Sequence, residues 1–157
     1  MPSKRPAKAT AARRTRNDPG IRWRCPACDR SFGRPQQSHV CVPGLTLEQY
    51  LERQPAAYRP VYRAVLARLA RLGDLDVDPV EVGIMIKRAR TFCELRPRKR
   101  GVELSFKLSR SLAHPRITRV IRYSTHRIAY FVLLERAADI DDELMDWLAE
   151  SYLDSPR

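Results

Sequence analysis

Hydrophobic residues recur at helical spacing in the first half of the chain. Thr46-Leu47-Glu48-Gln49 has the pattern of a capping box, in which a threonine caps a helix and a glutamine three residues later reaches back to it. The spacing predicts a short helix that ends before Pro55. A second helix is predicted with Pro60 in its first turn and Gly73 after its end. Its apolar positions are Val61, Val65, Leu69 and Leu72.

The period changes from helical to two-fold after residue 73. Apolar residues alternate with polar ones most cleanly over 102–108, which is the pattern of a half-buried strand. Further strands are predicted over 80–86, 91–96, 117–123 and 127–134. The pattern therefore predicts an antiparallel sheet of about four to five strands.

A last helix is predicted to begin at Asp139 or Asp141, because acidic residues suit the positive end of a helix dipole. Its apolar residues include Leu144, Trp147 and Leu148. Helices, then an antiparallel sheet, then a closing helix predict an α+β fold.

The composition of the first residues does not suit a folded domain. Residues 1–19 contain no Val, Leu, Ile or aromatic side chain, so we expect a disordered basic tail there. The N-terminus lacks the apolar stretch of a secretory signal, and the longest apolar run is too short to span a bilayer. We therefore expect a cytoplasmic protein with no membrane partner.

Four metal-ligating residues follow the tail. Cys25 and Cys28 form a C-P-x-C turn, while His39 and Cys41 stand two apart, so that an extended backbone places both on one side. Three thiolates and an imidazole complete a tetrahedral shell with no open position, which is the composition of a structural zinc site. The sequence therefore predicts a structural Zn²⁺ in a knuckle over residues 20–43.

The other interpretations of these cysteines fit less well. A redox C-x-x-C pair would need a βαβ context, and a disulfide is disfavoured in a reducing compartment. Trp23 and Phe32 are expected to cover the knuckle, and Cys93 to be a small buried residue in a strand. The remainder, residues 44–157, is then the α+β domain.

With these motifs the chain resembles the DUF5655 domain of bacteria and archaea, a domain of unknown function. The resemblance lies in W-x-C-P-x-C-x-R-x-F with its H-x-C closure, the Tyr50-Leu51 helix, the basic turn before 102–108, and the acidic entry to the last helix. It covers roughly residues 21–155 and implies an α+β domain behind a zinc knuckle, with no established activity. Asp29 departs from the glycine often found after the second cysteine.

No catalytic constellation emerges from the sequence. It contains no glycine-rich phosphate loop, no G-x-S-x-G and no H-E-x-x-H. Glu94-Leu95-Arg96 offers arginine where a nuclease would need lysine, and His114 and His126 have no evident partner. The acids at the start of the last helix favour capping over metal binding: Asp139, Asp141, Asp142 and Glu143. An enzyme is not predicted.

The formal net charge of +12 is unevenly distributed. Residues 84–127 carry thirteen basic side chains and two acidic ones, while residues 128–157 carry two basic and eight acidic ones. Such an excess favours a polyanionic partner, and DNA or RNA is the leading hypothesis. If two hairpin turns lie on one side, a phosphate-binding patch would consist of Lys87, Arg88, Arg90, Arg96, Arg98, Lys99 and Arg100.

Two alternatives remain open. The arginines could merely reflect composition and keep the protein in solution. The second hypothesis for function is a module that binds a small anionic ligand or a protein on the open face of the sheet. The charge difference between 84–127 and 128–157 would also support a homo-oligomer. Steep salt dependence and dependence on oligonucleotide length would favour nucleic acid.

Overall fold

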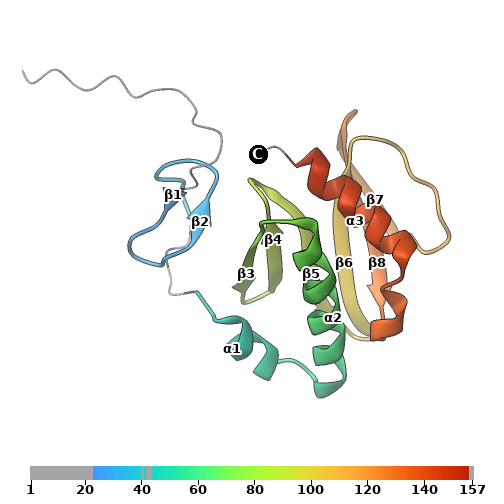
Figure 1. The fold of residues 1–157 in the computed structure, drawn as a ribbon, viewed down its shortest axis with the longest axis horizontal. Helices are drawn as coiled ribbons and strands as arrows, with labels where there is room; N and C mark the ends of the chain where they lie inside the picture. The colour runs from blue at the N-terminus through green and yellow to red at the C-terminus, as the bar shows by residue number, and fades with distance from the viewer. Residues whose placement is uncertain (1–22, 40, 42–43, 156–157) are drawn as a thin grey trace, which may run out of the picture.

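The computed structural model describes residues 23–39, 41 and 44–155, so the predicted tail over 1–19 lies outside the described residues. Figure 1 shows the chain as a small two-stranded ribbon beside a larger sheet with helices on it. The elements in chain order are β1 (Trp23–Arg24), β2 (Ser31–Phe32), α1 (Leu47–Glu52), η1 (Ala56–Tyr58), α2 (Arg59–Leu69), η2 (Ala70–Leu72), β3 (Asp76–Val80), β4 (Gly83–Lys87), β5 (Thr91–Arg98), β6 (Gly101–Leu108), β7 (Arg119–Ser124), β8 (Arg127–Leu134), η3 (Ala137–Asp139) and α3 (Asp142–Asp154).

The larger sheet confirms the α+β fold and its antiparallel pairing. Its strand order is β3-β4-β5-β6-β8-β7, and every neighbouring pair is antiparallel. The last hairpin is therefore inserted with β8 against β6, which leaves β7 at the edge. The sheet has six strands in place of the four to five predicted.

The additional strand comes from the segment predicted as one strand over 80–86. Val80 pairs with Gly83, so a tight turn at Glu81-Val82 divides the segment between β3 and β4. Neither turn residue has a positive φ, and Val82 is 57% exposed at the tip. Pro79 lies inside β3, where the missing N–H is tolerated because β3 is an edge strand.

The core lies between the helices and one face of the sheet. Figure 1 shows α2 and α3 in front of the strands, and α3 contacts β5 and β6. Leu104 on β6 is fully buried, and the ring of Trp147 on α3 stacks 5.8 Å from that of Phe106. Cys93 is 1% exposed, as predicted, and burial raises the pKa of its thiol.

The helix starts follow the sequence signals. The capping box is confirmed, because Thr46 Oγ1 accepts from Gln49 N at 3.2 Å and Gln49 Oε1 accepts from Thr46 N at 3.0 Å. Asp141 is the cap of α3 and accepts from Leu144 N at 2.9 Å, whereas Asp139 ends η3. No helix in the described part of the chain has the length and apolarity needed to cross a membrane.

Candidate functional site

The four predicted metal ligands lie together in the knuckle. The Sγ atoms of Cys25 and Cys41 are 3.6 Å apart, and Cys28 Sγ lies 3.3 Å from His39 Nε2. All four ligand atoms lie within 4.8 Å of one another, and the three thiols are free. A tetrahedral zinc ion would hold two sulfurs about 3.8 Å apart and a sulfur and a nitrogen about 3.6 Å apart. The quartet is therefore close enough to hold one metal ion.

The backbone between the first two ligands forms a tight turn. Asp29 N donates to Cys25 O at 2.8 Å, and Cys25 N donates to Arg30 O at 2.9 Å. Asp29 has a φ of 60°, the left-handed conformation that glycine adopts most readily and that aspartate also tolerates. Its carboxylate accepts from Arg24 at 3.3 Å. Aspartate thus fills the turn position where a glycine would be usual.

The orientation of His39 suits a metal ligand. Its Nδ1 lies 2.6 Å from Gln37 O, and because a carbonyl can only accept, Nδ1 carries the proton and leaves the Nε2 lone pair directed at the thiols. The ring packs on Phe32, with centroids 4.1 Å apart, and its edge meets Trp23 at 6.0 Å. The predicted apolar cover of the knuckle is confirmed, and it fixes the imidazole in place.

The thiols differ in acidity. Burial acts to raise the pKa of Cys25, but the backbone N–H groups of Ala27 and Cys28 outweigh it and lower this pKa to about 6. The hydrogen bond with Cys25 raises the pKa of Cys41 to about 11. The pair thus shares a proton that a bound cation would displace.

A nearly buried carboxylate joins the knuckle to the sheet. Asp78 on β3 accepts from Arg30 Nε at 3.2 Å and from Lys87 Nζ at 2.6 Å. The three side chains are only 10%, 19% and 14% exposed, for Asp78, Arg30 and Lys87 respectively. Lys87 also donates to Ser31 O at 3.5 Å. Lys87, which the sequence predicts for phosphate binding, lies in this contact between the two regions.

The structure does not bring the predicted basic cluster together. Its two turns, at 87–90 and 98–101, lie at opposite ends of β5, because consecutive turns of an antiparallel meander alternate between the ends of the sheet. An eight-residue strand separates them by roughly 26 Å. The condition for a single phosphate-binding patch, that the two turns lie on one side, is therefore not met.

Most members of that cluster are also paired. Arg96 bonds Glu94 at 3.2 Å, Arg98 bonds Glu103 at 2.7 Å, and Arg100 bonds Glu135 at 2.8 Å. Arg88 stacks 4.4 Å above the Tyr152 ring and donates to Tyr152 O, so it serves the C-terminal end of α3. Arg90 and Lys99 make no ion pair among the described residues.

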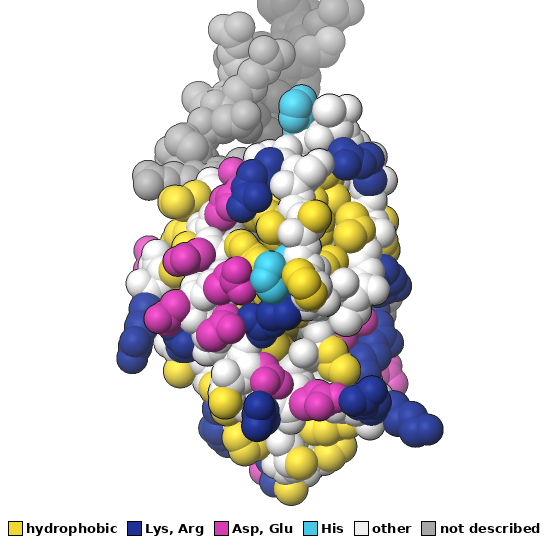
Figure 2. All heavy atoms as spheres, turned by 90° about the vertical axis from the view of Figure 1, so that its right-hand side faces the viewer, with side chains coloured by type: hydrophobic (Ala, Val, Ile, Leu, Met, Phe, Trp, Pro, Cys, Tyr) yellow, Lys and Arg dark blue, Asp and Glu magenta, His cyan; other side chains and the backbone are white. Residues whose placement is uncertain are grey.

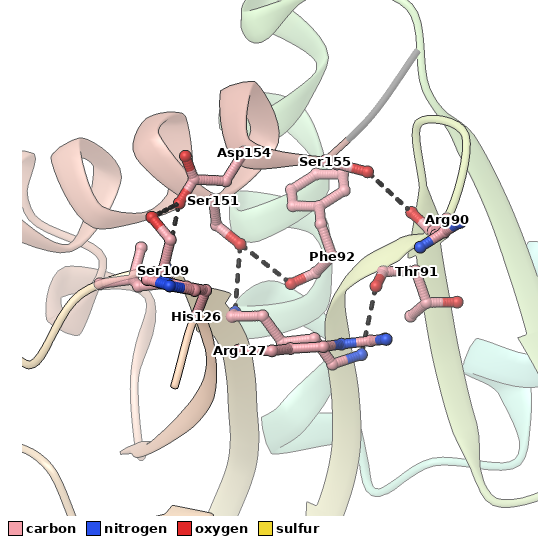
Figure 3. A pocket seen from close by; sticks show the side chains of 11 residues that line it. Arg90, Thr91, Phe92, Ser109, His126, Arg127, Ser151, Asp154 and Ser155 are labelled. Carbon is pink, nitrogen blue, oxygen red and sulfur yellow. Dashed lines mark hydrogen bonds between the residues drawn. The ribbon is translucent and has the colours of Figure 1, made fainter. Parts of the chain in front are cut away.

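A pocket of about 260 Å³ opens at the end of the sheet that carries Arg90 (Figure 3). It forms where β5 and β6 diverge, since their pairing begins only at Cys93 and Phe106. Ser151 from α3 enters this gap, accepting from Lys107 N at 3.1 Å and donating to Phe92 O at 3.2 Å. The basic side chains that line the pocket are Arg90, Lys107, His126 and Arg127.

The charges around the pocket are mostly of one sign. Lys107 Nζ has a backbone partner, Thr91 O at 3.2 Å, and burial lowers the pKa of this lysine, with nearby Arg127 acting in the same direction and Glu94 against it. The one acid in the lining, Asp154, accepts from both Ser109 N and Ser109 Oγ. The pocket is therefore an electropositive recess with few compensating carboxylates.

An exposed aromatic side chain lies beside this recess. Tyr123 at the end of β7 is 60% exposed, and the Arg127 guanidinium lies 6.0 Å from its ring centre. Sequence reasoning did not select Lys107, Tyr123 or Arg127, which come from three different strands. Lys107 was the only one with a local signal, as a lysine at a polar position of an alternating strand.

The acids of the last helix pair with basic residues of the same chain. Arg116 bonds Asp141 at 2.8 Å, and Arg110 bonds Glu150 at 2.7 Å. His114 Nε2 lies 3.3 Å from Glu143, a partner that the sequence did not reveal. Figure 2 shows acidic and basic side chains interspersed on one face of the molecule. Much of the charge difference between 84–127 and 128–157 is thus satisfied within one chain.

Comparison with known proteins identifies a family for this chain. A family model described as "Domain of unknown function (DUF5655)" matches residues 47–155. The match spans α1 to α3 and begins after the metal ligands, so the knuckle, which the sequence motifs placed within the resemblance, lies outside it. No curated protein and no solved structure matches the chain.

Proposed function

Because the chain belongs to the DUF5655 family, whose description assigns no activity, we propose a function from its own residues: a non-catalytic, zinc-stabilised module that binds nucleic acid. The observation that carries the proposal is the recess lined by Arg90, Lys107 and Arg127, with Tyr123 exposed beside it. We call the surface formed by Arg90, Tyr123 and Arg127 the basic end.

Zinc suits the ligand set better than other common metals. Three thiolates and one imidazole with tetrahedral spacing favour zinc over the oxygen-preferring cations Mg²⁺ and Ca²⁺. Four protein ligands leave no position for a reactive water, so the ion stabilises the knuckle and takes no part in chemistry.

The basic end combines the two features that single-stranded nucleic acids require. Arg90 and Arg127 make no ion pair with a carboxylate among the described residues, so their guanidinium groups are available to phosphates. Tyr123 offers an exposed ring on which a base can stack. Arginine beside an aromatic ring is a common arrangement on surfaces that bind single strands.

The opposite end of the sheet lacks this combination. Arg98 and Arg100 are each paired with a glutamate, and Tyr58, the neighbouring tyrosine, donates its hydroxyl to the carbonyls of Arg98 and Lys99. Phosphate contacts there would have to displace existing ion pairs. The proposal therefore assigns binding to one end of the sheet, with the net charge of +12 adding long-range attraction.

The test is a fluorescence anisotropy titration of zinc-loaded protein against single- and double-stranded oligonucleotides at several salt concentrations. We expect Arg90→Gln and Arg127→Gln each to weaken binding and to reduce the slope of log K against log salt by about 0.7–0.9. Tyr123→Ala should weaken single-strand binding by about 1–3 kcal/mol. The matched controls are Arg98→Gln and Arg100→Gln, which change the same charge at the opposite end.

A chain lacking residues 1–19 separates the contribution of the basic N-terminal segment. The proposal requires that this shortened chain still binds and still responds to Arg127→Gln. Binding that disappears with residues 1–19, or that falls equally in the control variants, would refute it. A protein-interaction role would then be the better hypothesis.

A further inference from the structure

The size of the pocket limits what it can hold. Pockets for complete cofactors or drug-sized ligands usually measure about 300–1,000 Å³, and this one measures about 260 Å³. It is lined by side chains from β5, β6, β8 and the end of α3, so it is a recess between elements and not a continuous groove. Its occupant is therefore a single small group.

The charge of the lining indicates the charge of that group. Arg90, Lys107 and Arg127 contribute three positive charges, and Asp154 contributes one negative charge. Burial and the nearby Arg127 both disfavour the charged form of Lys107, while Glu94, which is outside the pocket lining, favours it. Bringing like charges together in a recess is unfavourable unless an anion joins them. The lining therefore carries a net positive charge, which favours an anionic occupant.

The hydrogen-bonding groups narrow the chemical class. Figure 3 shows Arg90, Ser109, His126 and Arg127 among the side chains around the recess. Guanidinium and ammonium groups from several directions suit an anion with three terminal oxygens better than a flat carboxylate with two. A phosphomonoester has three such oxygens and carries close to two negative charges at neutral pH.

We propose that this pocket binds a phosphomonoester group, which in a nucleic-acid complex is the terminal phosphate of the strand. An internal phosphodiester has one charge and a chain on both sides, so it follows a groove, whereas a terminal phosphate can enter a recess. Tyr123 beside Arg127 then stacks on the terminal base. The assignment to a strand end rests on the proposed function, but the binding of a phosphomonoester does not.

The experiment uses the full zinc-loaded chain and one oligonucleotide sequence with a 5′-phosphate, a 3′-phosphate or hydroxyls at both ends. We expect one phosphorylated form to bind about tenfold more tightly than the unphosphorylated one, as charge-assisted hydrogen bonds allow. Lys107→Gln and Arg127→Gln should reduce this preference to less than about twofold. Lys99→Gln and Arg100→Gln, at the opposite end of the sheet, should leave it unchanged. Because Arg127 is exposed, its variant remains informative even if Lys107→Gln alters folding.

Inorganic phosphate and a nucleoside monophosphate, titrated separately, distinguish the sources of the group. Equal affinity for all three oligonucleotides would overturn the inference and leave nucleic-acid binding intact. If no oligonucleotide binds but a nucleoside monophosphate binds in a manner sensitive to Lys107→Gln, the pocket stands and the proposed function fails. Absence of binding to every one of these ligands would overturn both.

Discussion

The knuckle and the α+β domain are held together in different ways. In the knuckle the buried cluster consists of Cys25, Cys28 and Phe32, and two of these three belong to the quartet that is close enough to hold a metal ion. In the domain 24 buried side chains form one continuous core. Three side chains bury too little surface to offset the entropy of ordering the knuckle, whereas the domain core can stabilise itself. We therefore expect metal coordination to stabilise the knuckle, as apolar burial stabilises the domain.

The two tryptophans allow this difference to be measured. Trp23 lies in the knuckle against Phe32, and Trp147 lies in the domain core against Phe106. A Trp147→Phe chain therefore reports on the knuckle, and a Trp23→Phe chain reports on the domain. Tryptophan fluorescence of these two single-tryptophan variants follows the two regions separately.

Removal of the metal should produce the largest effect, and in the knuckle alone. Binding of structural zinc is worth about 10 kcal/mol or more. We expect a chelator, or Cys28→Ser, to shift Trp23 emission towards that of a solvent-exposed ring while Trp147 emission stays unchanged. Cys93→Ala is the matched control and should retain one zinc per chain. A parallel change in Trp147 would mean that the two regions fold as a single unit.

A cavity in the sheet should destabilise the domain and leave the knuckle nearly unchanged. Leu104 is fully buried in the middle of β6, so Leu104→Ala should lower the free energy of unfolding of the domain by about 2–5 kcal/mol. Urea unfolding followed by Trp147 measures this loss. Zinc affinity, determined by competition with a chelator of known affinity, should change little. A large loss of zinc affinity would contradict the separation of the two regions.

The contact at Asp78 should couple the two regions. Asp78→Asn removes the charged acceptor of the hydrogen bonds from the nearly buried cations Arg30 and Lys87, which should cost about 2 kcal/mol. We expect both Trp23 and Trp147 transitions to move to lower urea concentration. Asp74→Asn, an exposed change nearby, serves as the control. If only one transition moves, the carboxylate stabilises that region without joining it to the other.

The smallest effect should come from the cap of α3, and it depends on pH. The N–H of Leu144 and then Arg116 hold the pKa of Asp141 below its usual value. A lowered carboxyl pKa adds stability above the unfolded-state pKa, and this stability is lost as pH falls through the folded-state pKa. Asp141→Ala should cost about 1 kcal/mol at neutral pH. Asp141→Asn keeps the capping side chain, so it should lower the free energy of unfolding by less than Asp141→Ala, and this loss should vanish in acid. Asp146→Asn is the control and should not lower the free energy of unfolding.

The elements predicted correctly from the sequence have local signals. The capping box joins residues only three positions apart, and the alternation over 102–108 lies within one strand. The turn at Glu81-Val82 was missed because it contains no Gly, Asn, Asp or Pro to interrupt the alternation. Placement of β8 between β6 and β7 depends on tertiary contacts, for which no local pattern exists.

The metal quartet and the recess also differ in whether a local sequence pattern reveals them. The metal quartet could be predicted because all four ligands fall within one short segment with a known spacing. The recess could not, because Arg90, Lys107 and Arg127 are distant in sequence and meet only where β5 and β6 diverge. Clustering along the sequence was misleading for the basic turns, since residues close along a meander can lie at opposite ends of it.

The two edge strands of the large sheet have a consequence for how copies of this protein meet. At one edge, Pro79 interrupts the row of N–H donors that a strand from another molecule would need. At the other edge, exposed β7 carries Arg119 and Arg122, so two β7 strands placed side by side would repel each other. Neither edge favours growth of the sheet from molecule to molecule. Concentrated solutions of the folded protein should therefore resist fibril-like aggregation.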